Sequence, residues 1–523
     1  MSSRFSSGGH GAERLPTEAI FTEIYQSVWF DNTTDTEDRW FPPGCKWVTD
    51  DFSDPDLGRF TQQTEGTAGT LAIAAGVATV TLPLVGTHSL FVSEGAAIGM
   101  PQVTVAATVT GKTGIGGAYL AAVVGVIKDP NNYLCVNWDL QNNNILLQRK
   151  VAGVSTFTAG VSTAGWGAFP IRVALTIVGN FAYIWAYYSS TWHLVQSTDL
   201  TATIDFKAED HSLWYGFFGG VAPGTVANTI SFDDFHIGRF GGVGVRDLCI
   251  VTNPDGSAYD ALGTYQRYVL ATLAGPYGGI PSGSMGCFVF DTRTKELIQT
   301  SVIMCQRGGK VQNDHAGHAV RNADGSTHLL ISTWGDNPTN PPMIRHELVA
   351  AGTDPLTTDY VMASSAELAL TELPAGGAQY DPFLVLIEGT YYLAYTASES
   401  TANDFYPVID TSTDLATWTN HGMDSDARPY EGSRITKFAG TYYALWGGQS
   451  NMRMYTLAPW AYYGLVNALS PGYVDPNQTQ PHAMIWPEQS TYWLLTFDPY
   501  TYPPTTGPAF SWGRVRLFAS PRY

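Results

Sequence analysis

The C-terminal half of the chain, from about residue 245, is built from a repeated unit. Each unit opens with a polar residue and a short apolar stretch, passes through a turn, and continues into an aromatic stretch, as in YDPFLVLIEGTYYLAYTAS and YEGSRITKFAGTYYALWGG. The polar openings are Asp247, Asp314, Asp381, Glu431 and His482. They follow one another at intervals of 67, 67, 50 and 51 residues. Repeats of this length with several strands each are typical of a β-propeller, so five repeats predict five blades.

The repeat also predicts chemistry. The innermost strands of a propeller run along its central axis, so residues at the same place in each repeat meet at one end of the channel. That ring would hold three Asp, one Glu and one His. Clustered carboxylates repel one another, which stability alone would not select. Glycoside hydrolysis, in contrast, requires a pair of carboxyl groups in which one is ionised and the other carries a proton.

The ring residues resemble those of glycoside hydrolase family 43, whose members and relatives in families 32 and 62 are five-bladed propellers. The resemblance rests on Asp247, on Asp381-Pro382, on Glu431-Gly432 and on His482, and on the phrases STDLATW and EGSRITKFAGTYYALWG. It covers about the last 275 residues. Two departures are RDL in the first repeat, where Asp-Pro is commoner, and EGS where EGP is usual.

The resemblance implies a role for each acid. Asp247 would be the general base that activates water, Asp381 would orient the acid, and Glu431 would be the general acid that protonates the leaving oxygen. The implied reaction inverts the anomeric centre, with the base and the acid roughly 6.5–9.5 Å apart. Glycans that contain arabinose or xylose are the implied substrates, with arabinan-type polymers first. Each acid also has a structural interpretation: Asp381, for example, precedes a proline and could cap the start of a strand.

Further residues around the ring are expected to contact sugar, either by stacking or by lining a subsite. These substrate-binding candidates are Asp314, His315, Trp334, Tyr380, Tyr430, Trp446 and Trp486. His318 could join Asp314 and His315 in a subsite, and about half of the aromatic residues could instead belong to the core. His482 takes the place of an axial histidine near a bound calcium ion or water cluster, although a structural role fits it equally. No cofactor is required by this chemistry.

Residues 47–240 have a different pattern of short strands, which opens on DDFSDPDLGRF and closes on SFDDFHIGRF. This pattern resembles the concanavalin-like (laminin-G-like) jelly-roll sandwiches that accompany many glycosidases. Such a sandwich either binds sugar or supports its neighbour. The predicted fold is therefore all-β, with an N-terminal β-sandwich followed by a five-bladed propeller in residues 241–523. Residues 1–46, a Ser/Gly-rich arm followed by FTEIYQSVWF, are expected to be a docking segment.

Composition limits the partners. The formal net charge of −19 argues against nucleic acid and against anionic membrane surfaces, but is compatible with neutral sugars. The five cysteines show no CxxC spacing, which favours buried free thiols over a disulfide framework.

The start of the sequence lacks the apolar core of a signal peptide, which predicts synthesis in the cytoplasm and release by lysis or as part of a particle. Together with the modules, this favours a phage tail or virion protein that contacts other tail proteins through residues 1–46 and assembles as a homotrimer. Its expected activity is hydrolysis of a surface or plant-type polysaccharide. The alternatives are a non-catalytic glycan receptor-binding protein and a purely structural virion protein.

Overall fold

The structure of the chain is a computed structural model. The structure describes residues 15, 22–26, 46–65, 69–82, 88–93, 102–113, 121–129, 131–139, 143–189, 191–208, 214–220, 228–238, 245–263, 265–273, 284–295, 297–336, 340–371, 377–399, 404–427, 429–448, 451–466, 484–488, 491–497 and 515–521. All regular secondary-structure elements among these residues are β-strands, joined by turns and irregular segments, which confirms the predicted all-β fold. No helix in the described part of the chain could span a membrane.

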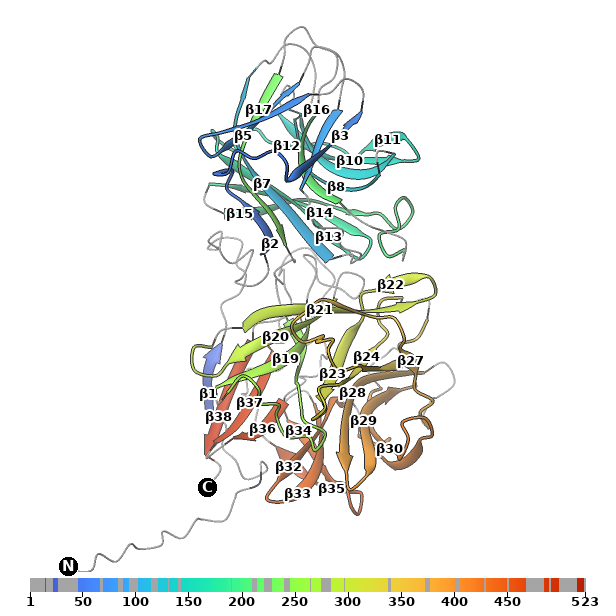
Figure 1. Ribbon diagram of the computed structural model, residues 1–523. Coiled ribbons are helices and arrows are strands. Elements are labelled where there is room, and N and C mark those ends of the chain that lie inside the picture. The colour runs from blue at the N-terminus through green and yellow to red at the C-terminus, as the bar shows by residue number, and fades with distance from the viewer. Residues whose placement is uncertain are drawn as a thin grey trace, which may run out of the picture. The chain divides into compact units, whose positions relative to one another are not determined.

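The chain divides into two compact units (Figure 1). The first consists of Met1–Trp29, Gly242–Cys305 and Asn313–Tyr523, and the second of Phe30–Gly241 and Gln306–Gln312.

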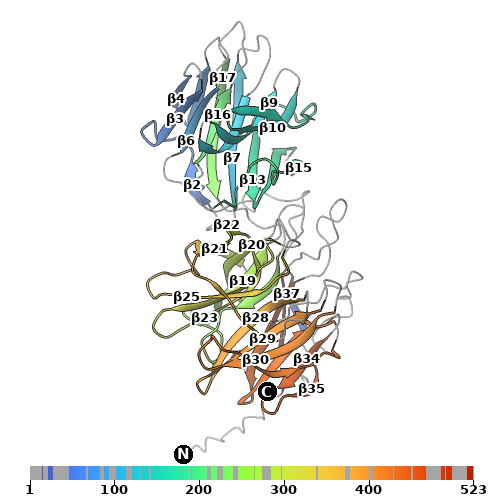
Figure 2. The ribbon, with the colours of Figure 1, turned by 90° about the vertical axis from the view of Figure 1, so that its right-hand side faces the viewer.

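The strands of the first unit form five sheets, antiparallel except for one parallel pair (Figures 1 and 2); β22, the last strand in the order of the first sheet, belongs to the residues of the second unit. The first sheet has the order β18 (Val245–Ile250), β19 (Gln266–Leu273), β20 (Ser284–Asp291), β21 (Leu297–Arg307) and β22 (Lys310–Gln312), with β26 (Tyr360–Met362) parallel to β21. The second has the order β23 (His315–Arg321), β24 (Thr327–Ser332), β25 (Ile344–Val349) and β27 (Ala366–Glu367). The third has the order β28 (Ala378–Ile387), β29 (Thr390–Ser398), β30 (Tyr406–Ser412) and β31 (Thr419–Met423). The fourth has the order β32 (Glu431–Phe438), β33 (Thr441–Gly447), β34 (Met452–Thr456) and β35 (Ala461–Val466).

The fifth sheet combines strands from both ends of the chain: β36 (Met484–Glu488), β37 (Thr491–Phe497), β38 (Val515–Pro521) and β1 (Thr22–Gln26). The segment expected to be a docking arm therefore supplies the outer strand of this sheet, where Thr22 lies opposite Ala519. The first strands of successive sheets contact one another from β18 through β23, β28 and β32 to β36, which in turn contacts β18. A closed ring of five such sheets is a five-bladed β-propeller.

An irregularity near the start of each innermost strand sets the register of the first four blades. The pairing shifts between Arg246 and Cys249, between His315 and Gly317, between Tyr380 and Phe383, and between Glu431 and Arg434. Within each shift one residue has a left-handed backbone: Asp247 (φ 54°), Ala316 (φ 45°), Asp381 (φ 55°) and Gly432 (φ 73°). Such bulges add an unpaired residue and bend the strand.

The positions of these bulges differ from the alignment of the repeats that the sequence predicted, which is therefore corrected. Ala316 and Gly432 are the structural equivalents of Asp247 and Asp381, whereas Asp314 lies two residues before its bulge and Glu431 one residue before. Side-chain hydroxyls connect one blade to the bulge of the next. The backbone N–H of Ala316 donates to Thr272 Oγ1 at 2.9 Å, and that of Asp381 donates to Ser332 Oγ at 3.0 Å.

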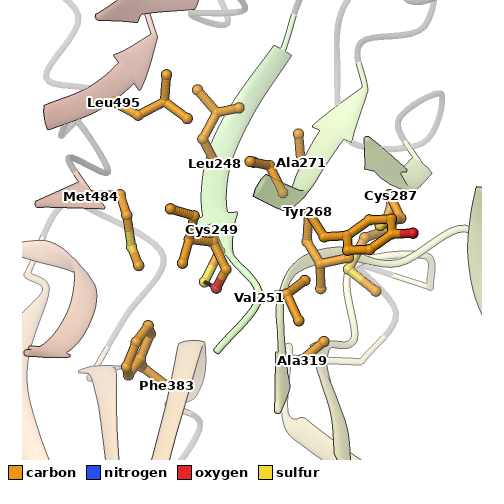
Figure 3. Packing of buried hydrophobic residues seen from close by; sticks show 14 of the residues in the cluster. Leu248, Cys249, Val251, Tyr268, Ala271, Cys287, Ala319, Phe383, Met484 and Leu495 are labelled. Atoms are coloured by element: carbon orange, nitrogen blue, oxygen red, sulfur yellow. Dashed lines mark hydrogen bonds between the residues drawn. The ribbon is translucent and has the colours of Figure 1, made fainter. Parts of the chain in front are cut away.

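One of the hydrophobic clusters of the propeller surrounds β18. Figure 3 shows Leu248, Cys249 and Val251 between Met484 and Leu495 of the fifth blade on one side and residues of the first and second blades on the other. Burial raises the pKa of the Cys249 thiol to about 11, so it is protonated at neutral pH. Four of the five cysteines are described, and all four are buried and form no disulfide, as expected; Cys45 lies outside the described residues.

The second unit is a sandwich of two antiparallel sheets. One has the order β11 (Val154–Phe157), β10 (Asn144–Val151), β9 (Asn132–Asp139), β8 (Ala121–Asp129), β16 (Trp214–Gly220), β6 (His88–Ser93) and β3 (Phe60–Glu65), with β12 (Val161–Ser162) beside β10. The other has the order β15 (Thr191–Asp199), β14 (Phe181–Tyr188), β13 (Ile171–Val178), β7 (Gln102–Thr113), β17 (Asn228–Gly238), β5 (Val77–Leu82) and β4 (Thr70–Ala74), with β2 (Lys46–Asp50) beside β17. Asp50 lies opposite Phe235, so the segments that open and close this unit in the sequence pair with each other. Phe52, Phe217 and Phe232 are among the residues of its core.

Candidate active site

Three carboxylates gather around one guanidinium at the bulged ends of the innermost strands. Asp247 lies on β18, Asp381 on β28 and Glu431 on β32, and all three are buried. Arg246 Nε donates to Asp247 Oδ1 at 2.9 Å. Burial alone would lower the pKa of Arg246, but the charges of Asp247, Glu431 and Asp381 raise it above its ordinary value. The acids that the sequence placed in different blades therefore act on a single cation.

Asp381 connects the third blade to the start of the fourth. Its Oδ2 accepts a hydrogen bond from the Gly432 N–H at 3.0 Å, and its backbone carbonyl accepts one from the Ser433 hydroxyl. These contacts fix Asp381 beside the residue that follows Glu431. A left-handed backbone costs a non-glycine residue roughly 1–2 kcal/mol. Ala316 has the same conformation, so the backbone geometry belongs to the blade, and what distinguishes Asp381 is its carboxylate.

An aromatic stack lies next to the acids. The rings of Tyr380 and Trp334 stack with centroids 4.9 Å apart, and Trp334 also stacks with His315 at 6.4 Å. Burial and the nearby charges of Glu431 and Asp381 raise the pKa of Tyr380, which keeps its phenol neutral. Three of the predicted sugar contacts therefore lie together beside the carboxylates, but Tyr380 and His315 are buried and only Trp334 is partly exposed. The prediction that a sugar contacts Tyr380 and His315 is corrected.

The neighbouring polar candidates of the second blade are buried and have structural contacts. Asp314 is fully buried and accepts a hydrogen bond from the Gly335 N–H at 2.8 Å. His318 is also fully buried; its Nδ1 accepts from the Leu384 N–H at 3.0 Å, so Nε2 carries the proton and donates to Thr252 Oγ1 at 3.1 Å. Burial lowers the pKa of His318 well below its usual value, which keeps the ring neutral. The expectation that His318 could line a subsite is corrected, since it connects three blades in the interior.

Tyr430 is half-buried, and its ring is already in contact with protein groups. Its Oη donates to Asn451 Oδ1 at 3.0 Å, and the guanidinium of Arg453 lies 4.9 Å from its ring centroid. Arg453 is paired with Asp424 at 3.0 Å. One face of the Tyr430 ring is thus covered by a cation instead of being open to a sugar.

Two of the tryptophans predicted to stack on sugar are core residues. Trp446 is 0% exposed and donates its indole N–H to the Tyr395 carbonyl at 3.2 Å. Trp486 is 2% exposed and belongs to the same hydrophobic cluster. The prediction for both is corrected, because a substrate cannot reach a ring that other side chains enclose.

The metal prediction falls on a residue that the structure does not describe. His482 lies outside the described residues. Among the described residues no group of three or more His, Cys, Asp or Glu side chains could hold a metal ion.

Arg246 is the member of the cluster that the sequence did not indicate. Its position, one residue before the bulge, is the one that His315, Tyr380 and Glu431 occupy in the next three blades. This equivalence was the available signal, and a repeat alignment that allowed for the bulge would have found it.

Comparisons with known proteins gave matches among solved structures. No family model matches the sequence, and no curated protein matches it. A levansucrase variant of B. subtilis is 12% identical, with 49% of this chain and 79% of that chain covered and a TM-score of 0.36. The inulosucrase of Halalkalicoccus jeotgali bound to kestose is 12% identical, with 53% and 84% covered and a TM-score of 0.40. A carbohydrate-binding module from Bacillus subtilis is 16% identical, with 34% and 94% covered and a TM-score of 0.23.

Proposed function

We propose that the propeller is a glycoside hydrolase that cleaves a polysaccharide by acid–base catalysis. The observation that carries this proposal is the gathering of Asp247, Asp381 and Glu431 around Arg246 at one end of the ring of innermost strands. Buried carboxylates that share one cation are costly for stability and useful for proton transfer.

In the proposed reaction Glu431 is the general acid and Asp247 the general base. The bond from the anomeric carbon to the leaving oxygen breaks as that oxygen takes the proton of Glu431. A bond forms between the anomeric carbon and a water oxygen, and Asp247 takes the proton that the water loses. Asp381 accepts from the backbone N–H that follows Glu431, which supports its role in orienting the acid.

The substrate proposed is a neutral glycan. The net charge of −19 disfavours polyanions, and the half-buried ring of Trp334 beside the acids is suited to a sugar face. Arabinan- and xylan-like polymers, including bacterial cell-wall arabinan, are the first to test. We further propose that the protein is a phage tail component that acts on a bacterial surface glycan.

A second candidate function is glycan binding without turnover. The ion pair of Arg246 with Asp247 favours it, because a carboxylate that is held by a guanidinium is a weaker base.

Sugar release from a panel of arabinans, xylans and bacterial cell-wall glycans distinguishes the two functions. The panel is run with the wild type, with Glu431→Gln and with the control Glu367→Gln, which removes an exposed carboxylate of β27. We expect the wild type and the control to release sugar, and Glu431→Gln to lose at least about 100-fold of the rate. Binding of a glycan by all three proteins with release by none would establish the second function instead.

A further inference from the structure

The guanidinium of Arg246 is held on two sides. Its Nε donates to Asp247 Oδ1 at 2.9 Å, and its central carbon lies 5.8 Å from the ring centroid of Phe497 in the fifth blade. The Arg246 side chain is 20% exposed and the Asp247 side chain 5%. An arginine in this environment has little freedom to leave its partner.

Other charged groups reach this pair from two further blades. Asp381 comes from β28, and Glu431 and Arg434 come from β32. Arg434 Nη2 donates to the Leu248 carbonyl at 2.7 Å, so this second cation is bound to the backbone of β18. Asp247 acts on Arg246 through a hydrogen bond and through its charge, and the charges of Glu431 and Asp381 also raise the pKa of Arg246. The hydrogen bond of 2.9 Å is the contact that couples Asp247 to the cation.

We propose that Arg246 is a positioning residue that assigns different roles to the carboxylates. It keeps Asp247 ionised and oriented as the general base, and Glu431 carries the proton as the general acid. This inference rests on the proposed function. An adjacent positive charge favours the ionised form of a carboxyl group, and the effect is larger for the group that is hydrogen-bonded to it. Without such a difference, neither acid would be committed to one role.

The experiment compares the wild type, Arg246→Met and Arg246→Lys in the pH dependence of kcat/KM on a glycan that the wild type cleaves. The acidic limb reports ionisation of the base. In Arg246→Met we expect this limb to move to higher pH by roughly 1 unit or more, and further than the alkaline limb moves. Arg246→Lys keeps the charge and should restore most of the limb position, while its kcat stays below that of the wild type because the guanidinium geometry is lost. Acidic limbs at the same pH in all three proteins would overturn the proposal, because a merely structural role changes the rate without moving the limb.

Thermal stability provides a second measurement that does not depend on turnover. It can therefore refute this inference separately from the proposed function. We expect Arg246→Met to lower Tm at pH 7, and the difference from the wild type to shrink as the pH falls to about 3 and the carboxylates become protonated. The control is Arg293→Met, which removes an arginine that is 68% exposed and lies 3.8 Å from Asp291. Its effect on Tm should be small at every pH. A Tm difference for Arg246→Met that does not change with pH would contradict the pairing of Arg246 with Asp247, whether or not any glycan is cleaved.

Discussion

Gly448 is the residue through which the environment of Tyr430 can be tested most sharply. A Cβ atom at Gly448 would lie 2.5 Å from Cε1 of Tyr430 and 3.0 Å from its Cδ1 and Cζ. Carbon atoms in contact are usually at least about 3.5 Å apart, so in Gly448→Ala the ring must move by roughly 1 Å. Gly448 is not among the residues with positive φ, so alanine adds no backbone strain there.

The loss of stability expected for Gly448→Ala follows from the contacts that the Tyr430 ring would lose. Tyr430 donates to Asn451 and lies under the guanidinium of Arg453. The hydrogen bond contributes about 0.5–1.5 kcal/mol and the cation–π contact about 0.5–1 kcal/mol. Gly448→Ala should therefore destabilise the protein by about 1–2.5 kcal/mol, which lowers the Tm of the propeller by roughly 2–10 °C. Because Tyr430 directly precedes Glu431, we also expect sugar release to fall.

A double-variant cycle, followed by scanning calorimetry, isolates this contact. If the clash is with the Tyr430 ring, Gly448→Ala should change stability by less than about 0.5 kcal/mol in a Tyr430→Ala background. An equal loss of stability in both backgrounds would show that the added methyl group acts elsewhere, and would refute the reasoning.

Three further predictions concern stability. Ala316→Gly should stabilise the protein by up to about 1 kcal/mol. It relieves about 1–2 kcal/mol of left-handed backbone strain in the folded state, but glycine also increases the conformational entropy of the unfolded chain, which offsets part of this gain. A lower Tm for the variant would show that Ala316 is not strained. His346 lies 2.9 Å from His328, and burial, together with His328, lowers the pKa of His346 from 6.5 to about 4. Since only the unfolded chain takes up this proton between pH 6.5 and 4, stability should fall by as much as about 3 kcal/mol as the pH falls through this window, and His346→Gln should flatten the dependence in urea titrations. Asp314→Ala should cost about 1–3 kcal/mol by leaving the Gly335 N–H without this acceptor, and Asp314→Asn, which keeps an acceptor, should cost less; equal losses would exclude that hydrogen bond as the cause.

The sequence was sufficient for the class of fold, because repeat length and strand alternation are properties of the chain itself. It was not sufficient for the register of the ring. A bulge adds one residue with a left-handed backbone, and Asp, Ala and Gly all occupy that place, as Asp247, Ala316 and Gly432 do. An alignment by polar residues therefore placed Asp314 in the ring, where the bulge places Ala316.

The unknown register also explains why the positions of Trp446 and Arg246 were not predicted. A shift of one residue along a strand exchanges its two faces, so sequence alone did not distinguish an enclosed Trp446 from one at the axis. Arg246 was missed for a related reason, since an arginine beside an aspartate is usual on a solvated surface. Its contact with Asp247 and its proximity to Phe497 depend on the bulge and on the fifth blade, neither of which a local pattern specifies.

The central claim is that Asp247 and Glu431 serve one catalytic site, and the most direct test is the additivity of their loss. The rate of glycan hydrolysis is measured for Asp247→Asn, for Glu431→Gln and for the double variant. Residues that act as a unit are not additive, so each single variant should lose at least about 100-fold and the double variant little more than the worse of the two. Wild-type rates in either single variant, or losses that multiply in the double variant, would contradict a shared site.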